Sequence, residues 1–329
     1  AEEAIYLARR ETEVLGRSAL LPQVNSAYSY ENSDTDVDGK ASLPGIGDFD
    51  TKSNRDVDTD GYVVSLNQAI FDLPAWFDFQ SGKEVTREAE ATFASNQQNL
   101  IVRTVEAYLL VLRAQDNLAA SRAQERSFER QLEQTQQRFE VGLIAITDVY
   151  EAQAARDLSQ VERIVDENNV KVALERLSVL TGKRHENLDI LKEDFEIKPP
   201  EPLDRAAWVD FSLANNFLLQ ASKYREEAAR QSAKASRLEH APKVSGGYSY
   251  SDYTDDGSLD VKPDTGFTST PDQDVESHMW EIRVDMPLYS GGAISANRRA
   301  SAQEFNAARE ERINLTRNTV TNTRSLHMT

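Results

Sequence analysis

The chain has 329 residues, a formal net charge of −18 at pH 7 and no cysteine. Without cysteine it can form no disulfide scaffold, no thiolate zinc site and no cysteine nucleophile. Its acidity argues against a nucleic-acid partner, because affinity for a phosphate backbone comes mainly from lysine and arginine. No run of about 18 apolar residues occurs, so the sequence predicts no membrane-spanning helix.

Residues 1–75 are predicted to form the end of a helix and two strands, at about residues 20–30 and 61–72. The segment between the strands, residues 31–60, carries a net charge of −6 and is rich in Asp, Gly and Ser. These residues favour turns, so we expect a long exposed loop. Two Asp-rich stretches begin like calcium-binding EF-hand loops, but Gly45 and Asn67 occupy the twelfth position, where a glutamate ligand is needed. We therefore expect no specific metal site.

Residues 76–186 are predicted to form a long helical hairpin. From residue 76 to 139 there is no proline, and Ala, Gln, Glu, Arg and Leu dominate. Apolar residues recur at steps of three and four, the spacing of a coiled coil. Gly142 suits the left-handed cap that ends a helix, and Thr147 or Asp148 is placed to cap the next one, which is expected to stop at Gly182.

Residues 187–239 are predicted to form a proline-rich linker followed by a helix from about Leu203 to Glu239. Residues 240–292 then provide two more strands around a second acidic segment, residues 251–277, with a net charge of −7. We expect this segment to be an exposed loop as well. Residues 293–329 are predicted to start another long helix.

The chain contains an internal repeat. Residues 8–30 and 228–250 share eight identities at a constant offset of 220, and a second match follows each acidic segment at an offset of 218. Each copy is therefore predicted to contain a helix, a strand, an acidic loop, a second strand and a long helix. The chain is a duplicated unit and not two unrelated domains.

The predicted strands alternate between apolar and polar residues, which is typical of strands with one buried face. The apolar positions are Tyr62, Val64 and Leu66 in one strand and Trp280, Ile282, Val284 and Met286 in another. Two interpretations fit this pattern: a soluble sandwich with these faces in its core, or a barrel with lipid outside and water inside. Four strands cannot close a barrel alone, so the second interpretation requires an oligomer.

No catalytic site is predicted. The four histidines lie in different elements without the spacing of metal ligands, and the Gly-Gly pairs lack the other residues of a phosphate-binding loop. We therefore expect neither enzymatic activity nor a cofactor.

The turn of the hairpin carries the most specific motif. Residues 137–149 read QRFEVGLIAITDV, and this segment resembles the TolC family, the outer-membrane channel-tunnels of Gram-negative bacteria. Four further segments match the family: Leu20–Gln23, Gln68–Asp72, Thr104–Tyr108 and Pro287–Gly292. The 220-residue duplication also corresponds to the internal repeat of that family.

The resemblance implies an α+β fold in which a long coiled-coil hairpin forms part of a periplasmic tunnel. Each protomer of a homotrimer would give four antiparallel strands to one twelve-stranded barrel in outer-membrane lipid, with the acidic loops outside the cell. The strand residues Tyr62, Val64, Leu66, Trp280, Ile282, Val284 and Met286 would then face the membrane. Compared with the family, the chain is expected to be truncated at both ends.

The family's function is a passive duct for tripartite efflux or type I secretion. Val141, Gly142 and Leu143 match the tip that docks a periplasmic adaptor (membrane fusion) protein, which recruits an inner-membrane pump of RND, ABC or MFS type. Thr147 and Asp148 match residues that hold the tip closed. The alternative is a soluble periplasmic coiled-coil protein that acts as an interaction scaffold.

Overall fold

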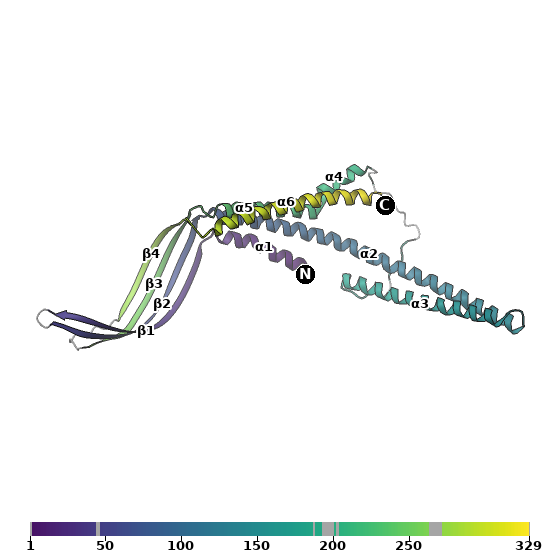
Figure 1. Cartoon of the computed structure of the whole chain (residues 1–329), viewed down its shortest axis with the longest axis horizontal. Coiled ribbons are helices and arrows are strands. Elements are labelled where there is room, and N and C mark those ends of the chain that lie inside the picture. Colours follow the sequence, from purple (N-terminus) through teal and green to yellow (C-terminus); the bar gives the residue numbers. More distant parts are fainter. Residues whose placement is uncertain are drawn as a thin grey trace. The chain divides into compact units, whose positions relative to one another are not determined.

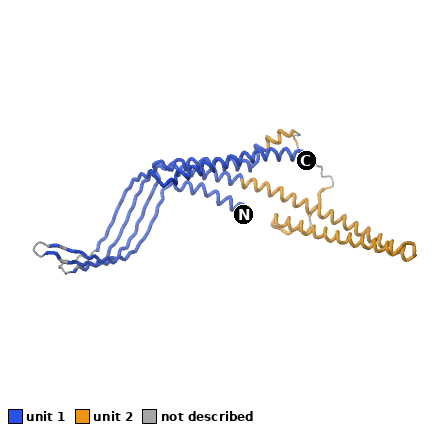
Figure 2. The backbone as a smooth tube through the Cα atoms, in the orientation of Figure 1, with its two compact units in different colours: residues 1–91, 212–329 blue, residues 92–211 orange. Residues whose placement is uncertain are grey.

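The computed structural model describes residues 2–43, 47–186, 188–192, 201, 204–262 and 272–328. The chain divides into two compact units, one of residues 1–91 and 212–329 and the other of residues 92–211 (Figure 2). The helix α2, Leu73–Glu140, begins in the first unit and continues into the second.

The first unit contains a four-stranded antiparallel sheet (Figure 1). Its strands lie side by side in chain order: β1 (Gln23–Leu43), β2 (Gly47–Phe71), β3 (Lys243–Lys262) and β4 (Gln273–Asp285). A bulge between Ala69 and Phe71 shifts the register where β2 ends against β3. The two copies of the repeat thus contribute one hairpin each, and the hairpins pair through β2 and β3.

The prediction that the acidic segments are loops is wrong for the residues described. β1 and β2 pair continuously from Gln23–Asn67 out to Leu43–Gly47, and β3 continues to Lys262. Backbone pairing outweighs the turn preference of aspartate here, because the carboxylates stand in solvent and accept cross-strand hydrogen bonds. Asn54, for example, donates to Asp34 and Asp36 at 3.0 and 2.9 Å. Residues 44–46 and 263–271 of the expected loops lie outside the described residues.

Four helical segments of the first unit extend from one end of the sheet: α1 (Glu2–Ser18), the start of α2, α5 (Phe217–Arg237) and α6 (Ala293–Leu326) (Figure 1). α1 and α2 approach closely because glycine faces backbone at their crossing. A Cβ atom on Gly16 would lie 3.0 Å from the Phe79 Cα atom, and one on Gly82 would lie 2.9 Å from the Thr12 carbonyl oxygen. Small side chains also join α5 to α6, where the Ser236 and Ser301 hydroxyls lie 2.9 Å apart and buried.

The second unit is built on the hairpin of α2 and α3 (Ile146–Thr181). Its core consists of Val111 and Ala114 from α2 and Ala173 and Leu177 from α3. α3 ends where Gly182 takes up the left-handed conformation at φ 67°, as its position in the sequence predicts. Among the described residues, no helix is long and apolar enough to cross a lipid bilayer.

The single helix expected from Leu203 to Glu239 is two helices. α4 (Arg205–Asn215) and α5 are separated at Asn216, whose side chain accepts a hydrogen bond from the Leu219 backbone N–H at 3.0 Å. Asparagine is among the strongest N-cap residues, and this cap starts a new helix without proline or glycine. Leu203 and much of the expected linker lie outside the described residues.

Candidate functional site: the two sheet faces and the hairpin tip

The register of the sheet sorts its side chains by residue number. Directly opposed pairs such as Tyr28–Tyr62, Val64–Tyr250 and Tyr248–Trp280 join even numbers to even numbers across all three strand pairings. Opposed residues of antiparallel strands point to the same side. Before the bulge at Ala69, even-numbered residues therefore form one face, the even face, and odd-numbered residues form the other, the odd face.

The half of the even face next to the helices is apolar and aromatic. It contains the predicted strand positions Tyr62, Val64, Leu66, Trp280, Ile282 and Val284, while Met286 follows directly after β4. Trp280 and Ile282 are 81 and 79 % exposed, so no part of the chain that the structure describes covers them. The other hairpin strands add residues that belong with these: Val24, Tyr28, Tyr30, Val244, Tyr248 and Tyr250. Their alternation was visible in the sequence, but only the pairing register places them on the same face.

The odd face behind this apolar band is polar. A hollow in it is lined mainly by amide and hydroxyl side chains, among them Asn25, Ser65, Asn67, Ser245 and Ser249. Its charged residues Glu281 and Arg283 form an ion pair, with Oε1 and Nε 2.6 Å apart. One sheet thus separates an exposed apolar surface from a hydroxyl-rich one.

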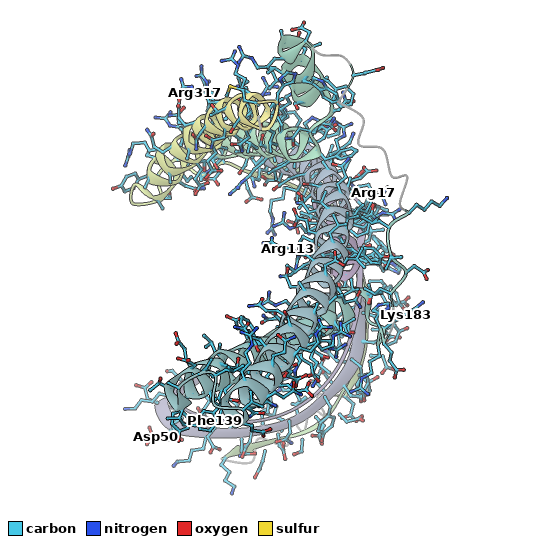
Figure 3. The ribbon with its side chains drawn as sticks, turned by 90° about the vertical axis from the view of Figure 1, so that its right-hand side faces the viewer. Arg17, Asp50, Arg113, Phe139, Lys183 and Arg317 are labelled. Carbon is cyan, nitrogen blue, oxygen red and sulfur yellow. The ribbon has the colours of Figure 1, made fainter. Side chains whose placement is uncertain are left out.

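The outer half of the even face is acidic. Along the four strands the even face holds thirteen carboxylates and three lysines, and all of them lie beyond the aromatic residues (Figure 3 labels Asp50 at the outer end of β2). Hydrogen bonds stabilise several of these carboxylates. Those from Asn32 (3.0 Å) and the Tyr30 hydroxyl (2.7 Å) hold the pKa of Asp58 below its ordinary value. In β1, β2 and β3 the last residue of the apolar part is a tyrosine, and in β4 it is Trp280.

That line crosses the sheet at a slant. The last aromatic residue on the even face is Tyr30 in β1, Tyr62 in β2, Tyr250 in β3 and Trp280 in β4. Since Tyr30 is paired with Asp60, Tyr250 with Val64 and Trp280 with Tyr248, the line moves by two residues at every strand. The line moves about 6.8 Å along the strand for each strand spacing of about 4.8 Å. The strands are therefore tilted by about 55° from the direction perpendicular to this line. Strands of membrane barrels are also tilted, by about 35–45° from the barrel axis.

The tip of the hairpin presents two exposed apolar side chains on a tight turn. Val141 and Leu143 are 70 and 74 % exposed, and Gly142 between them adopts φ 75°. The turn is closed by hydrogen bonds from the Gly142 N–H to the Phe139 carbonyl and from the Leu143 N–H to the Arg138 carbonyl, both 2.9 Å. Figure 3 labels Phe139 in the last turn of α2. The glycine is needed because other residues rarely adopt a positive φ.

Neither Thr147 nor Asp148 is the N-cap of α3, which is Ala145. Asp148 occupies the third helical position, and its Oδ2 accepts a hydrogen bond from the Ala145 N–H at 3.3 Å. This is the returning half of a capping box, in which a carboxylate one turn into the helix satisfies a free backbone N–H. It fixes Asp148 at the tip but leaves its second oxygen available to another molecule.

Comparisons with known proteins agree with this arrangement. A model of the family described as "Outer membrane efflux protein" matches residues 2–183 and 208–327. Alkaline protease secretion protein AprF of Pseudomonas aeruginosa is 33% identical over 297 residues, which cover 89% of this chain and 59% of the relative. Outer membrane protein TolC of Vibrio cholerae is 28% identical over 92% of this chain and 64% of the relative. The chain thus spans about three fifths of the length of these curated relatives.

Solved structures show the same fold. The outer-membrane channel OprN matches with a TM-score of 0.71 and 18% identity, over 99% of this chain and 69% of that one. The CmeC outer membrane channel of Campylobacter jejuni matches with a TM-score of 0.69 and 14% identity, over 95% and 64%. The sheet, the hairpin and the family match together establish that this chain belongs to the outer membrane efflux protein family.

Proposed function

We propose that the complete protein is a homotrimeric exit duct in the outer membrane of a Gram-negative bacterium, serving a tripartite efflux pump or a type I secretion system. The observation that carries this proposal is the even face, on which one exposed apolar band crosses all four strands. The ten residues from Tyr62 to Phe71 have the length of a tilted membrane-spanning strand, about 9–11 residues. Lipid would cover the even face and water the odd face.

A trimer follows from the number of strands. β1 and β4 each have one free edge, and a four-stranded sheet cannot close on itself. If β1 of one copy pairs with β4 of the next, three copies give a closed barrel of twelve strands. The exposed edges are then satisfied, as a membrane barrel requires.

The hairpin tip is the proposed docking site for a periplasmic adaptor. Val141 and Leu143 offer apolar contact, and Gly142 lets another helix approach the backbone closely. Thr147 and Asp148 lie in the first turn of α3, where contacts with neighbouring hairpins would hold the tip closed. The adaptor would connect the duct to an inner-membrane pump of the RND, ABC or MFS type. The names of the relatives AprF and PrtF, both secretion proteins, support a secretion role beside efflux.

The alternative of a soluble periplasmic scaffold is less well supported. A soluble protein rarely exposes a large continuous apolar surface. Here Trp280, Ile282 and Val284 are each at least 63 % exposed in a row along one strand. Only lipid or a large partner would cover such a band.

The proposal is tested by expressing the complete open reading frame, purifying the protein in detergent and reconstituting it in planar bilayers. We expect a trimer in detergent and stepwise increases in conductance. A monomer that partitions into the aqueous phase without detergent and produces no conductance would rule out the duct and favour the scaffold.

A further inference from the structure

We infer that the inner wall of the barrel is electrically balanced, so that the strongly acidic sheet lets cations and anions pass with little discrimination. This inference rests on the proposed function, which identifies the odd face with the lumen. It concerns the ion selectivity of the barrel, which the net charge of the chain alone would predict wrongly. A duct with a charge of −18 per copy would be expected to concentrate cations.

The carboxylates of the sheet lie mostly on one face, while the basic residues are divided equally between the two faces. The even face carries thirteen carboxylates against three lysines, whereas the odd face carries four carboxylates against three basic residues. The odd-face carboxylates are Glu31, Asp255, Glu281 and Asp285, and the basic residues are Arg55, Lys243 and Arg283. The acidity therefore belongs to the outside of the proposed barrel.

The charges on the odd face are also compensated locally. Glu281 and Arg283 are paired at 2.6 Å, and Lys243 lies 3.4 Å from Asp72 and is opposed to Asp285 in the register. Asp255 accepts hydrogen bonds from the Thr59 hydroxyl at 2.6 Å and from the Gln273 amide at 3.1 Å. These hydrogen bonds stabilise the Asp255 carboxylate without cancelling its charge, and the charge that attracts it is Arg55 on the neighbouring strand β2. At these positions each carboxylate or ammonium therefore has an opposite charge near it.

The remaining wall is made of groups that bind neither sign of charge strongly. The odd face holds the uncharged polar residues Ser65, Ser245, Ser249, Ser251, Asn25 and Asn67. Neutral hydroxyl and amide groups exchange hydrogen bonds with water at little net gain. Cargo of either charge would slide along such a surface, so that selection would occur where cargo is loaded and not in the barrel.

Salt screening separates the two faces. At physiological ionic strength the Debye length is about 8 Å, comparable to the distance between side chains on opposite faces of a sheet. Carboxylates on the even face therefore act mainly on the solution outside. A carboxylate placed on the odd face acts directly on the permeating ions.

The test compares two neighbouring residues of β3 that lie at the same height but on opposite faces. Ser251→Asp adds a carboxylate to the odd face, and Asp252→Asn removes one from the even face. The complete trimer is reconstituted in planar bilayers, and its reversal potential is measured in a KCl gradient at about 0.1 M ionic strength. Ser251→Asp should raise the cation-to-anion permeability ratio at least about twofold, while Asp252→Asn should change it by less than about 1.3-fold.

A third variant keeps the test decisive if Ser251→Asp does not assemble. Arg283→Gln leaves Glu281 without its partner on the odd face and should raise the same ratio by a similar factor. The inference is overturned if Asp252→Asn lowers the ratio as much as either odd-face variant raises it. Absence of any conductance in the unmodified protein would instead refute the duct itself.

Discussion

At the scale of single residues, a partly buried carboxylate lies near the end of the sheet from which the helices extend. Asp78 in α2 keeps part of its surface exposed, yet burial of its carboxyl group raises its pKa above the ordinary value. Asp72 and Glu239 raise it further, and only Lys243 opposes them. Asp72 has a structural role of its own, because its two oxygens accept from the Ala75 N–H at 2.9 Å and bind the Lys243 ammonium at 3.4 Å.

We expect Asp78→Asn to stabilise the protein at pH 7. A carboxyl whose pKa is raised by folding binds more protons in the folded state, so its contribution to stability is lost as the pH rises through the folded pKa. The amide removes that penalty, by less than about 1 kcal/mol because the group is partly exposed to solvent. Thermal unfolding of the detergent-solubilised trimer should give a higher midpoint for the variant at pH 7 and equal midpoints near pH 4.

Asp72→Ala is a control that is expected to lower the stability instead of raising it. It removes the cap of Ala75 and the partner of Lys243, so it should lower the midpoint at pH 7, by about 1 kcal/mol for the cap. A lower midpoint for Asp78→Asn as well would show that its charge stabilises this corner.

At the scale of elements, the pairing of β2 with β3 depends on one glycine. A Cβ atom on Gly61 would lie 2.3 Å from the Asp252 carbonyl oxygen and 2.8 Å from the Tyr253 Cα atom. Gly247, in β3 of the same sheet, would place its Cβ no closer than 3.7 Å to any atom. An added methyl group would therefore clash with the backbone of β3 at Gly61 but would find room at Gly247.

Gly61→Ala should push the two strands apart and destabilise the trimer by about 1–3 kcal/mol, the usual cost of overpacking. Gly247→Ala should be tolerated because its added methyl group makes only ordinary contacts. Urea unfolding followed by tryptophan fluorescence measures both. Equal midpoints for the two variants would contradict the close approach at Gly61.

The proposed adaptor-docking role of the hairpin tip can be tested without changing the sheet. Leu143→Asp replaces a side chain that is 74 % exposed, so it should leave folding and trimer formation intact. If Leu143 is an apolar anchor for an adaptor, the charge should weaken association at least about tenfold, equivalent to about 1.4 kcal/mol. Gln136→Asp is the matched control, because it adds the same charge at an exposed position on α2, outside the turn. Unchanged crosslinking of Leu143→Asp to the adaptor would remove this residue from the docking site.

At the scale of the whole molecule, the duplication made much of the fold predictable. The repeated Pro-strand segment around Tyr28 and Tyr248 indicated two equivalent strand pairs, and the glycines at 142 and 182 marked the end of α2 and the end of α3 correctly. The acidic strands were missed because Asp, Gly, Ser and Thr dominate them, so that scattered odd-face residues such as Val57 and Leu259 give only a weak hydrophobic alternation. The sorting of charge by face was equally hidden, since it depends on the register between strands far apart in the sequence. The Asn216 cap was missed because no proline or glycine marks it.

The unequal lengths of the two outermost strands have a consequence for traffic through the duct. Among the described residues β1 has 21 residues and β4 has 13. If β4 of the neighbouring copy paired with β1 over this described length only, about eight residues of β1 would keep an open edge in the proposed trimer. Open strand edges recruit other extended chains, and an exported polypeptide would emerge unfolded beside them. Asp34, Asp36 and Asp38 carry negative charge along this part of β1. Closely spaced like charges discourage strand addition, so in the proposed duct this acidity would keep exported chains from adding to the open edge.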